Sequence, residues 1–393
     1  MAPKRPAVQL PLSWKIIESK MNPKKILHLY SNFKWTGPAD HALKLVTWLK
    51  PLEDVEALFA CGRRRGVQNT LYQKACQHEL DFVNGLFLKK HISWQMIPDI
   101  YSIKKFVNRQ QIKLIHSHQD NDSLTAVLAG LSDRLIRTCY DGEPAPLNFR
   151  QRFFYNRTGK ILTASLAVQT YLSEIFPEKD IQQVDIPVDH ELFRPFEKNP
   201  KLLAEFGLAA DTPVGGIVAR VQKHRNFALL LDAIEQVVNE IPDFKFLIVG
   251  RGTHIDTVAR KPVKDRGLDS NVIFTGYRKE DYHEVLNLFD YKIFLVPGSD
   301  GSCRAVREAL ACAKPVIAAR RGILPELIGD GKTGILIEEK PADLARAMLT
   351  MTKDRDFRLS CSRAARQYAK TVLGPERYVR KVIAAYDSIM EKG

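Results

Sequence analysis

Short runs of aliphatic and β-branched residues alternate along most of the chain with longer segments in which apolar residues recur every three or four positions. The short runs are typical of buried strands, and the longer segments of amphipathic helices such as 40–49 and 100–110. The strands expected from this pattern are 25–30, 55–60 and 112–116, with weaker ones at 135–139 and 160–164, followed by 214–219, 244–250, 272–275, 291–296, 315–318 and 334–337. Because strands that alternate with helices form parallel sheets, the sequence predicts an α/β protein with doubly wound parallel sheets.

The alternating pattern is interrupted near the middle of the chain. The stretch from Ile186 to Pro195 holds two prolines among polar residues and fits neither the strand nor the helix period, as is typical of a linker between domains. A chain of 393 residues suggests two domains, at roughly 100 to 200 residues each. We expect an N-terminal extension at 1–20, a first Rossmann-like domain at 21–190, a second at 191–370 and a C-terminal helix at 371–393.

The composition is that of a globular protein, with 45% hydrophobic and 26% charged residues, which excludes disorder, collagen and coiled coil as descriptions of the whole chain. No run approaches the roughly 18 consecutive apolar residues of a membrane-spanning helix. The six cysteines form no CxxC pair and no cluster of zinc spacing, so neither a disulfide framework nor a structural metal site is predicted. No apolar signal segment follows the basic N-terminus, and we expect a cytoplasmic protein.

Basic residues outnumber acidic ones by 59 to 45, which gives a formal net charge of +14. A positive surface of this size favours anionic partners such as nucleic acid, an anionic membrane face or phosphorylated substrates. Local basic clusters occur at 63–65, 89–90 and 104–105. Such clusters are more often solvated faces than recognition sites, and charge alone does not choose among the partners.

The segment from Val296 to Pro315 is the most informative for chemistry. Asp300 and Glu308 are separated by seven residues, with a Gly/Ser loop after the first acid and a helical stretch that carries the second. A helix that starts at the end of a buried strand presents free backbone N–H groups and the positive end of its dipole, which together suit a phosphate. Ser302, Cys303 and Arg304 would lie at that helix start. The alternative is an ordinary helix start with Asp300 as its cap.

Two arginines stand on the loop after the first strand of the second half. Arg220 closes that strand and Arg225 follows five residues later, with Lys223 between them. Guanidinium groups hold phosphate oxygens through two hydrogen bonds at once. The pair is therefore a candidate phosphate site at the same edge of the sheet, the alternative being an exposed loop with unrelated basic residues.

Taken in order, these motifs resemble those of family 4 of the retaining glycosyltransferases, which have the GT-B fold of two Rossmann-like domains facing a cleft. The resemblance extends from about Lys24 to the end of the chain and is strongest from Val214 to Ile337. The family's elements correspond to Arg220 and Arg225, the turn at 249–252, the loop at 274–277, Asp300 and Glu308, the strand at 314–317, and Pro325–Glu326. A match to so many motifs in the same order indicates the family far more specifically than a match to any single motif does.

The resemblance implies roles for individual residues. Glu308 would bind the ribose hydroxyls of a nucleotide-sugar, and Arg220 and Arg225 would neutralise the departing diphosphate. The other donor-binding residues implied are Gly250 in the turn at 249–252, Tyr277 and Arg278 near the base, and Ser302, Cys303, Arg304 and Ala305 at the sugar and phosphate. Two departures from the family pattern leave the donor's identity open: Asp300 replaces a glutamate, and Arg225 replaces a lysine.

The first half offers fewer signals. Gly37 stands where the family has a glycine-rich loop close to the transferred sugar, and His118 matches the family's histidine after the fourth strand, where we expect it to face the cleft in a catalytic role. His116 is expected to point the other way. Asp120 and Asp122 look like the metal-binding DxD motif of a different glycosyltransferase fold and are given no such role. The terminal helix is expected to cross back to the first domain, as in GT-B proteins, the alternative being a surface helix of the second.

The function implied is transfer of a sugar from a nucleotide-diphosphate-sugar to an acceptor hydroxyl with retention of configuration, with no metal or other cofactor. Arg220, Arg225, His118, Asp300 and Glu308 are the catalytic candidates. A basic first domain suits a glycolipid or cell-surface glycan acceptor such as lipopolysaccharide, at the inner face of the cytoplasmic membrane. The alternatives are a GT-B enzyme that acts on a soluble sugar or sugar phosphate, as a synthase or phosphorylase does, and a non-catalytic sugar-nucleotide-binding protein. No nucleic-acid partner is expected, because no recognition module is present.

Overall fold

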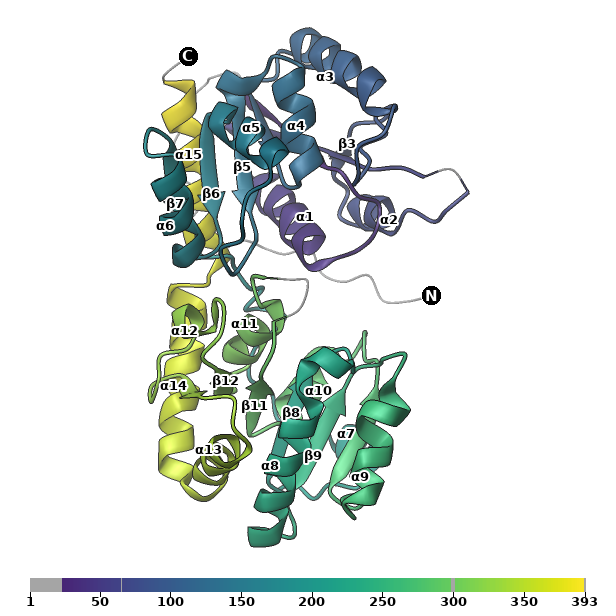
Figure 1. The fold of residues 1–393 in the computed structure, drawn as a ribbon, viewed down its shortest axis with the longest axis vertical. Helices are drawn as coiled ribbons and strands as arrows, with labels where there is room; N and C mark the ends of the chain where they lie inside the picture. The colour runs from purple at the N-terminus through teal and green to yellow at the C-terminus, as the bar shows by residue number, and fades with distance from the viewer. Residues whose placement is uncertain (1–22, 65, 298–300, 392–393) are drawn as a thin grey trace.

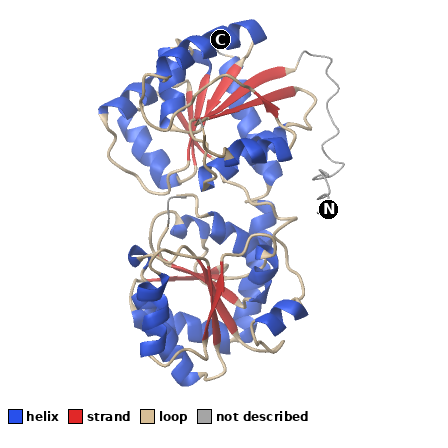
Figure 2. Cartoon of the chain, turned by 90° about the vertical axis from the view of Figure 1, so that its right-hand side faces the viewer, coloured by secondary structure: helices blue, strands red, loops and turns tan. Residues whose placement is uncertain are grey.

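The computed structural model describes residues 23–64, 66–297 and 301–391, which form two α/β halves placed one beyond the other along the long axis of the molecule (Figure 1). Each half contains one parallel sheet, and helices cover both faces of each sheet (Figure 2). The predicted α/β fold class is confirmed.

The first half is built on a seven-stranded sheet in the order β3-β2-β1-β4-β5-β6-β7. Its strands are β1 (Lys24–Tyr30), β2 (Val55–Cys61), β3 (Asp81–Phe82), β4 (Leu114–Ser117), β5 (Leu135–Cys139), β6 (Lys160–Thr163) and β7 (Asp180–Gln183). The chain builds outward from β1 to β3 and then returns to place β4 on the other side of β1. Open α/β sheets bind ligands outside the carboxyl ends of strands at such a reversal, called the switch point.

Two layers of helices enclose this sheet. They are α1 (Gly37–Leu49), α2 (Thr70–Gln77), α3 (Met96–Gln110), α4 (Asp120–Leu128), the short η2 (Ser132–Arg134), α5 (Phe149–Arg157) and α6 (Leu166–Ile175). Apolar residues of α1 and α2 pack on one face, and those of α3 to α6 pack on the other. Thr36 caps the start of α1 by accepting a hydrogen bond from the backbone N–H of Ala39, and Pro38 occupies its first turn, so this helix begins at a defined residue.

The second half repeats the plan with a six-stranded sheet in the order β10-β9-β8-β11-β12-β13. Its strands are β8 (Val214–Val218), β9 (Lys245–Val249), β10 (Val272–Gly276), β11 (Tyr291–Phe294), β12 (Val316–Ala319) and β13 (Gly334–Ile337). Its helical segments are α7 (Pro200–Glu205), η3 (Lys223–Arg225), α8 (Phe227–Glu240), η4 (Asp256–Arg260), α9 (Lys261–Asp265), α10 (Tyr282–Leu288), α11 (Arg304–Ala311), α12 (Leu324–Leu327), α13 (Pro341–Lys353) and α14 (Arg355–Thr371). The switch point of this sheet lies between β8 and β11.

The last helix, α15 (Pro375–Met390), packs on the first half although it follows the second in sequence. Tyr378, Val382 and Tyr386 are buried in the same core cluster as the apolar face of α1. At the end of the helix, Asp387 accepts a hydrogen bond of 2.6 Å from Nζ of Lys24, at the start of β1. The end of the chain therefore ties the two halves together.

The strand pattern read from the sequence is confirmed except at the edges of the first sheet. Strands β3 and β7 were not predicted. β3 is two residues long, and β7 has the sequence Asp-Ile-Gln-Gln, so neither carries the apolar run of a central strand. Among the described residues, no helix combines the length and the apolar character that crossing a membrane requires.

Candidate functional site

The carboxyl ends of the two sheets face one another, and residues of the two halves meet between them. Nε2 of His41, on α1, lies 2.6 Å from Oγ of Ser302, just before α11. The backbones of Gly142 and Gly301 approach so closely that a Cβ atom on Gly142 would lie 2.3 Å from the carbonyl oxygen of Gly301. Figure 1 accordingly shows α11 on the side of the second half that faces the first. The loop before α11 therefore lies where the halves meet.

Arg220 and Arg225 lie at the switch point of the second sheet. Arg220 follows β8 and is exposed, and Nη1 of Arg225 donates a hydrogen bond of 2.6 Å to the carbonyl oxygen of Val296, just after β11. Burial and the neighbouring charge of Arg220 lower the pKa of Arg225, and its Nε atom is buried without a hydrogen-bond partner. Within 23–64, 66–297 and 301–391 neither guanidinium forms an ion pair, so a bound anion would neutralise both.

Helix α11 begins at the contact between the halves. Its N-cap residue, Cys303, has a left-handed backbone with φ of 52° and makes no capping bond through its side chain. In the first turn, Nη1 of Arg304 lies 3.3 Å from Oδ2 of Asp40, and its Nε lies 3.6 Å from Oε1 of Glu308. The positive end of the helix dipole therefore adds to the charge of Arg304 on the side that faces the first half.

Glu308 is held by side chains of neighbouring elements and is only 6% exposed. The hydroxyl of Tyr282, on α10, donates a hydrogen bond of 2.9 Å to Oε2 of Glu308. The fully buried Lys292 of β11 donates a hydrogen bond to the carbonyl oxygen of Ala305, on the same helix as Glu308. Burial lowers the pKa of Lys292 to about 8, although the charge of Glu308 opposes this shift. The carboxylate is thus fixed in position by Tyr282 and Arg304.

Three residues of α1 that sequence patterns did not single out also belong to this region: Asp40, His41 and Lys44. Nζ of Lys44 lies 3.0 Å from Oδ2 of Asp40. Burial alone would raise the pKa of Asp40, but the charges of Lys44, Arg304 and His41 outweigh burial and lower it to about 2. Asp40 is therefore ionised and links the first half to Arg304 of the second.

The signal that could have found these residues is their spacing on one helix, directly after the predicted Gly37–Pro38 helix start. Positions i, i+1 and i+4 lie on neighbouring parts of a helix surface, near its N-terminus. Their partners, however, are far away in sequence, since Ser302 is 261 residues beyond His41.

The predicted glycines lie on turns at the same edges. Gly37 is the first residue of α1. Gly250 follows β9 with φ of 147°, and a Cβ atom there would lie 2.0 Å from the carbonyl oxygen of Ala219, in the loop after β8. Only glycine fits this position, because both the backbone angle and the space exclude a side chain. The close packing holds the turn after β9 against the loop that carries Arg220.

The two residues expected near the base differ in their surroundings. Tyr277 is 61% exposed, and the guanidinium of Arg251 lies 4.8 Å from the centre of its ring. Arg278 is paired instead: its Nη1 lies 2.7 Å from Oε1 of Glu205, and it also pairs with Asp281. Tyr277 is therefore accessible to a ligand, whereas Arg278 is engaged within the protein.

The structure shows the surroundings of the two histidines at the end of β4, His116 and His118. His118, which was expected to face the cleft, is 1% exposed, with Nε2 3.1 Å from Nδ1 of His28 and Nδ1 2.8 Å from the hydroxyl of Tyr140. His116 does not point the other way, since its ring stacks on that of His118 at 4.3 Å. The expectation for His116 was wrong because residues two apart in an extended segment lie on the same face.

The three histidines form a buried cluster whose ring nitrogens lie within 4.8 Å of one another, close enough to hold a metal ion. Most of these ring nitrogens, however, already have hydrogen-bond partners within the protein. Nδ1 of His116 lies 2.8 Å from the hydroxyl of Tyr386, and its Nε2 lies 2.7 Å from that of Thr138. Burial lowers the pKa of His28 to about 3 and those of His116 and His118 well below their ordinary value. The arrangement is that of a neutral hydrogen-bonded network.

Both carboxylates of the DxD-like segment have partners within the protein. Oδ1 of Asp120 lies 2.6 Å from Nη2 of Arg137. Asp122 accepts hydrogen bonds from the backbone N–H groups of His118 and Gln119 at the start of α4, and burial raises its pKa to about 7. These contacts within the protein explain both carboxylates without a bound metal ion. Asp300 lies outside the described residues.

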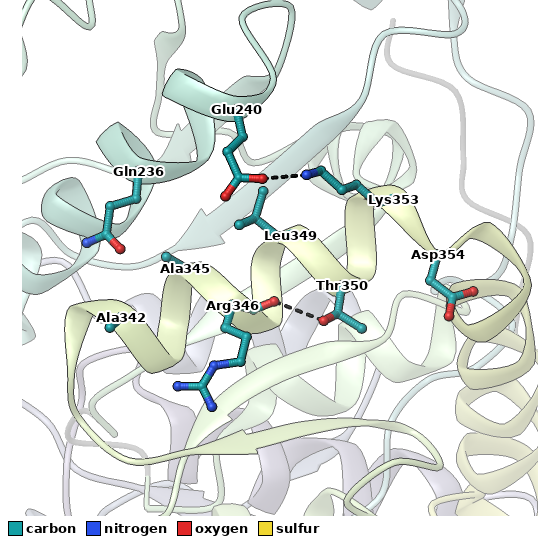
Figure 3. Close-up of a pocket in the computed structure, with 9 residues that line it drawn as sticks. All are labelled: Gln236, Glu240, Ala342, Ala345, Arg346, Leu349, Thr350, Lys353 and Asp354. Carbon is teal, nitrogen blue, oxygen red and sulfur yellow. Dashed lines mark hydrogen bonds and ion pairs between the residues drawn. The ribbon is translucent and has the colours of Figure 1, made fainter.

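A surface pocket of about 540 Å³ lies between α8 and α13, where Glu240 pairs with Lys353 (Figure 3). None of the residues predicted for the site lines it, and its lining residues come from those two helices and the turn after them. We assign it no function.

Residues 199–368 match the family model described as "Glycosyl transferases group 1". The chain is 25% identical to N-acetyl-alpha-D-glucosaminyl L-malate synthase of Bacillus anthracis over 251 residues, which are 63% of each chain. It is 35% identical to D-inositol 3-phosphate glycosyltransferase of Mycobacteroides abscessus over 191 residues, which are 46% of this chain and 41% of that protein. The matches thus span less than two thirds of these relatives.

The crystal structure of Anabaena HepE in complex with UDP superposes on the whole molecule with a TM-score of 0.77 and 20% identity, and covers 93% of this chain and 100% of HepE. That likeness identifies the GT-B fold, with two parallel α/β halves that face each other across their carboxyl edges. Residues 199–368 therefore resemble the glycosyltransferase group 1 family, and the molecule as a whole has the GT-B fold.

Proposed function

We propose that the protein is a retaining glycosyltransferase that moves a sugar from a nucleotide-diphosphate-sugar to an acceptor hydroxyl. The observation that carries the proposal is the positive charge of Arg220 and Arg225 at the switch point of the second sheet, beside the start of α11. Negative charge grows on the diphosphate as its bond to the sugar breaks. Cations already held in place there stabilise the transition state without reorganising.

The other residues of the donor site are proposed to have the roles that the family resemblance implies. Glu308 would bind the ribose hydroxyls, and Tyr282 and Arg304 hold its carboxylate in place. The remaining proposals are Gly250 in the donor-binding turn after β9, Ser302, Cys303, Arg304 and Ala305 at the phosphates and sugar, Tyr277 and Arg278 at the base, Gly37 at the transferred sugar, and Asp300 at the sugar's hydroxyls. No metal ion or other cofactor is part of the proposal, because the arginines and the start of α11 supply positive potential.

His118 is proposed as a positioning residue, because its side chain is buried. It holds the hydroxyl of Tyr140, whose ring stacks on that of His41 at 5.6 Å. His41 in turn contacts Ser302. The chain of contacts connects the switch point of the first sheet to the loop before α11.

We also propose that the chain divides into domains at 21–190 and 191–370, after the extension at 1–20, with 371–393 returning to the first domain. Movement about the linker at 187–195 would close the two domains on the donor and exclude water, which limits its hydrolysis. The contacts of Gly142 with Gly301 and of Asp40 with Arg304 would form on closure.

Calorimetric titration with UDP, GDP, ADP and CMP tests the donor site. We expect one of these nucleotides to bind, and Glu308→Ala to weaken its binding roughly tenfold or more, because hydrogen bonds to a charged group are lost. His118→Gln should leave the affinity unchanged and lower turnover, as befits a positioning residue. Glu240→Ala, which removes a carboxylate from the pocket of Figure 3, is the control. No binding to the wild type, or equal loss in the control, would contradict the proposal.

For the acceptor, we propose a lipid-linked or cell-surface glycan such as lipopolysaccharide, reached from the cytoplasmic face of the membrane. The excess of basic residues supports it, since acidic glycolipids are anionic. A soluble acceptor is the second candidate, because the Bacillus anthracis relative is named for L-malate. Labelled sugar recovered in the organic phase of a two-phase extraction supports the glycolipid, and label in the aqueous product supports the soluble acceptor.

A further inference from the structure

A strip of exposed apolar side chains lies on the first half, outside the proposed donor site. Seven large apolar or aromatic side chains of the described residues are more than half exposed, and four of them fall within residues 92–101. They are Ile92 (58%), Trp94 (87%), Ile97 (60%) and Tyr101 (70%). Ile97 and Tyr101 are four positions apart on α3 and share one face of it. Exposed apolar residues gathered in this way mark an interaction surface.

Basic residues border the strip on both sides. Lys89 and Lys90 precede it, and Lys104 and Lys105 follow it on the next turn of α3. The segment from 87 to 110 holds five lysines and arginines and one acidic residue, Asp99. That carboxylate is 2% exposed, so the outward surface of the strip is positive.

The strip is held firmly at the carboxyl edge of the first sheet. The two carboxylate oxygens of Asp99 accept hydrogen bonds of 2.8 Å from the backbone N–H groups of Phe87 and Leu88, which join the segment before α3 to the helix. Nδ2 of Asn121, in the first turn of α4, donates a bond of 2.8 Å to the carbonyl oxygen of Lys89. Since α4 starts where β4 ends, the segment that leads into the strip is anchored at the carboxyl edge of the first sheet.

We propose that residues 89–105 form a docking surface for the anionic face of a phospholipid membrane. Trp and Tyr side chains favour the boundary between headgroups and acyl chains, where their rings are buried and their polar atoms remain in water. Lysines on either side of such residues are attracted by anionic lipids, a pattern typical of segments that lie on a membrane without crossing it. The inference goes beyond the proposed transfer reaction, because membrane docking does not require a bound donor.

Sedimentation of the full chain with vesicles tests the docking surface. We expect binding to vesicles that contain phosphatidylglycerol, weak binding to phosphatidylcholine alone, and a loss of binding as salt is raised. Trp94→Ser/Ile97→Ser should weaken binding to the anionic vesicles about tenfold or more. Lys104→Glu/Lys105→Glu should weaken it and flatten its salt dependence. The matched controls lie on the second half: Leu359→Ser removes an exposed apolar side chain, and Lys261→Glu/Lys264→Glu reverses two exposed lysines of α9.

Three outcomes would overturn the inference. The wild type fails to bind anionic vesicles at low salt, or the control variants lose binding as strongly as the strip variants. In the third, Trp94→Ser/Ile97→Ser abolishes a concentration-dependent self-association in the ultracentrifuge while vesicle binding persists, which would assign the strip to a second copy of the chain. Nucleotide titration of this variant separates the two proposals: it should bind nucleotide as the wild type does, and failure of nucleotide binding in the wild type would leave the vesicle result standing.

Discussion

Arg304 stands between two carboxylates that belong to different halves of the molecule, Asp40 at 3.3 Å and Glu308 at 3.6 Å. Both carboxylates are at least nine-tenths buried. Charges removed from water interact strongly and are costly to leave unpaired. The three side chains therefore hold one another in place where the halves meet. Burial, and then the charge of Arg220, lower the pKa of Arg225, and the charge of a bound diphosphate would oppose that shift.

Replacing Asp40 by asparagine should lower the free energy of unfolding by about 2 kcal/mol at pH 7, because the carboxylate's pKa of about 2 lies below its ordinary value. A depressed pKa stabilises the folded state fully above about pH 4, and this contribution is lost as the pH falls toward about 2. The difference between wild type and variant should therefore shrink over that range. Urea denaturation at several pH values measures it.

Asp343→Asn is the control, since it removes an exposed ion pair with Arg346 on α13 that contributes little. A difference between the wild type and Asp40→Asn that stays constant from neutral to low pH would show that the carboxylate's charge is not what stabilises the contact.

The elements that carry the site are loops at the carboxyl ends of strands, and their backbones pack on one another. Gly250 lies against Ala219, and Gly252 lies in the same way against Val221, where a Cβ atom would be 1.9 Å from a carbonyl oxygen. The turn after β9 and the loop after β8 therefore move as one unit. A side chain at either glycine would displace the loop that bears Arg220.

Gly250→Ala should destabilise the protein by roughly 3 kcal/mol or more, because the new Cβ meets a backbone atom at a φ of 147° that side-chain-bearing residues avoid. Gly207→Ala is the matched control: its φ is +62°, but nothing lies within 4 Å of the Cβ, so we expect a cost of only about 1 kcal/mol. Equal costs in urea denaturation would show that the backbone angle matters and the contact with Ala219 does not.

At the scale of the whole molecule, several contacts among the described residues join the halves at their facing edges, and the His41–Ser302 contact is one of them. Besides the Asp40–Arg304 pair and the Gly142–Gly301 approach, Glu326 of α12 reaches the start of α6. Its carboxylate accepts hydrogen bonds of 2.7 Å from the hydroxyl of Ser165 and of 2.8 Å from the backbone N–H of Leu166. A carboxylate at a helix N-terminus is favoured by the exposed N–H groups there. These contacts define a closed arrangement.

Gly142→Ala should hold the halves apart, because its Cβ would lie 2.3 Å from the carbonyl oxygen of Gly301. Nucleotide affinity should remain unchanged, since Arg220, Arg225 and Glu308 all belong to the second half, whereas turnover should fall roughly tenfold or more as the acceptor side is displaced. Ala145→Val adds bulk to an exposed position of the same loop and is the control. Calorimetry measures the nucleotide affinity, a transfer assay measures turnover, and small-angle scattering measures the separation of the halves. A variant with normal turnover would show that this approach is not needed for activity.

Much of the fold followed from local pattern. Strands buried on both faces need continuous apolar runs, such as Phe246 to Val249, and these were visible without a structure. The edge strands β3 and β7 were not predicted, because an edge strand forms by pairing with its neighbour and needs no continuous apolar run. The helix of Glu308 and the turn at Gly250 were placed correctly for a similar reason: a helix start after a strand and a glycine turn are local features.

The sequence by itself determined the fold class, the order of the strands along the chain, the position of Arg220 and Arg225 in the loop after a strand and that of Glu308 on a helix after another strand. Short-range periodicity and turn chemistry encode these features. Only the tertiary structure decided that Asp40, His41 and Lys44 meet the loop before α11, that Arg278 is paired with Glu205, and that His118 is buried beside His28 and His116. Each of these facts depends on which residues distant in sequence become neighbours, and that depends on how the two halves pack.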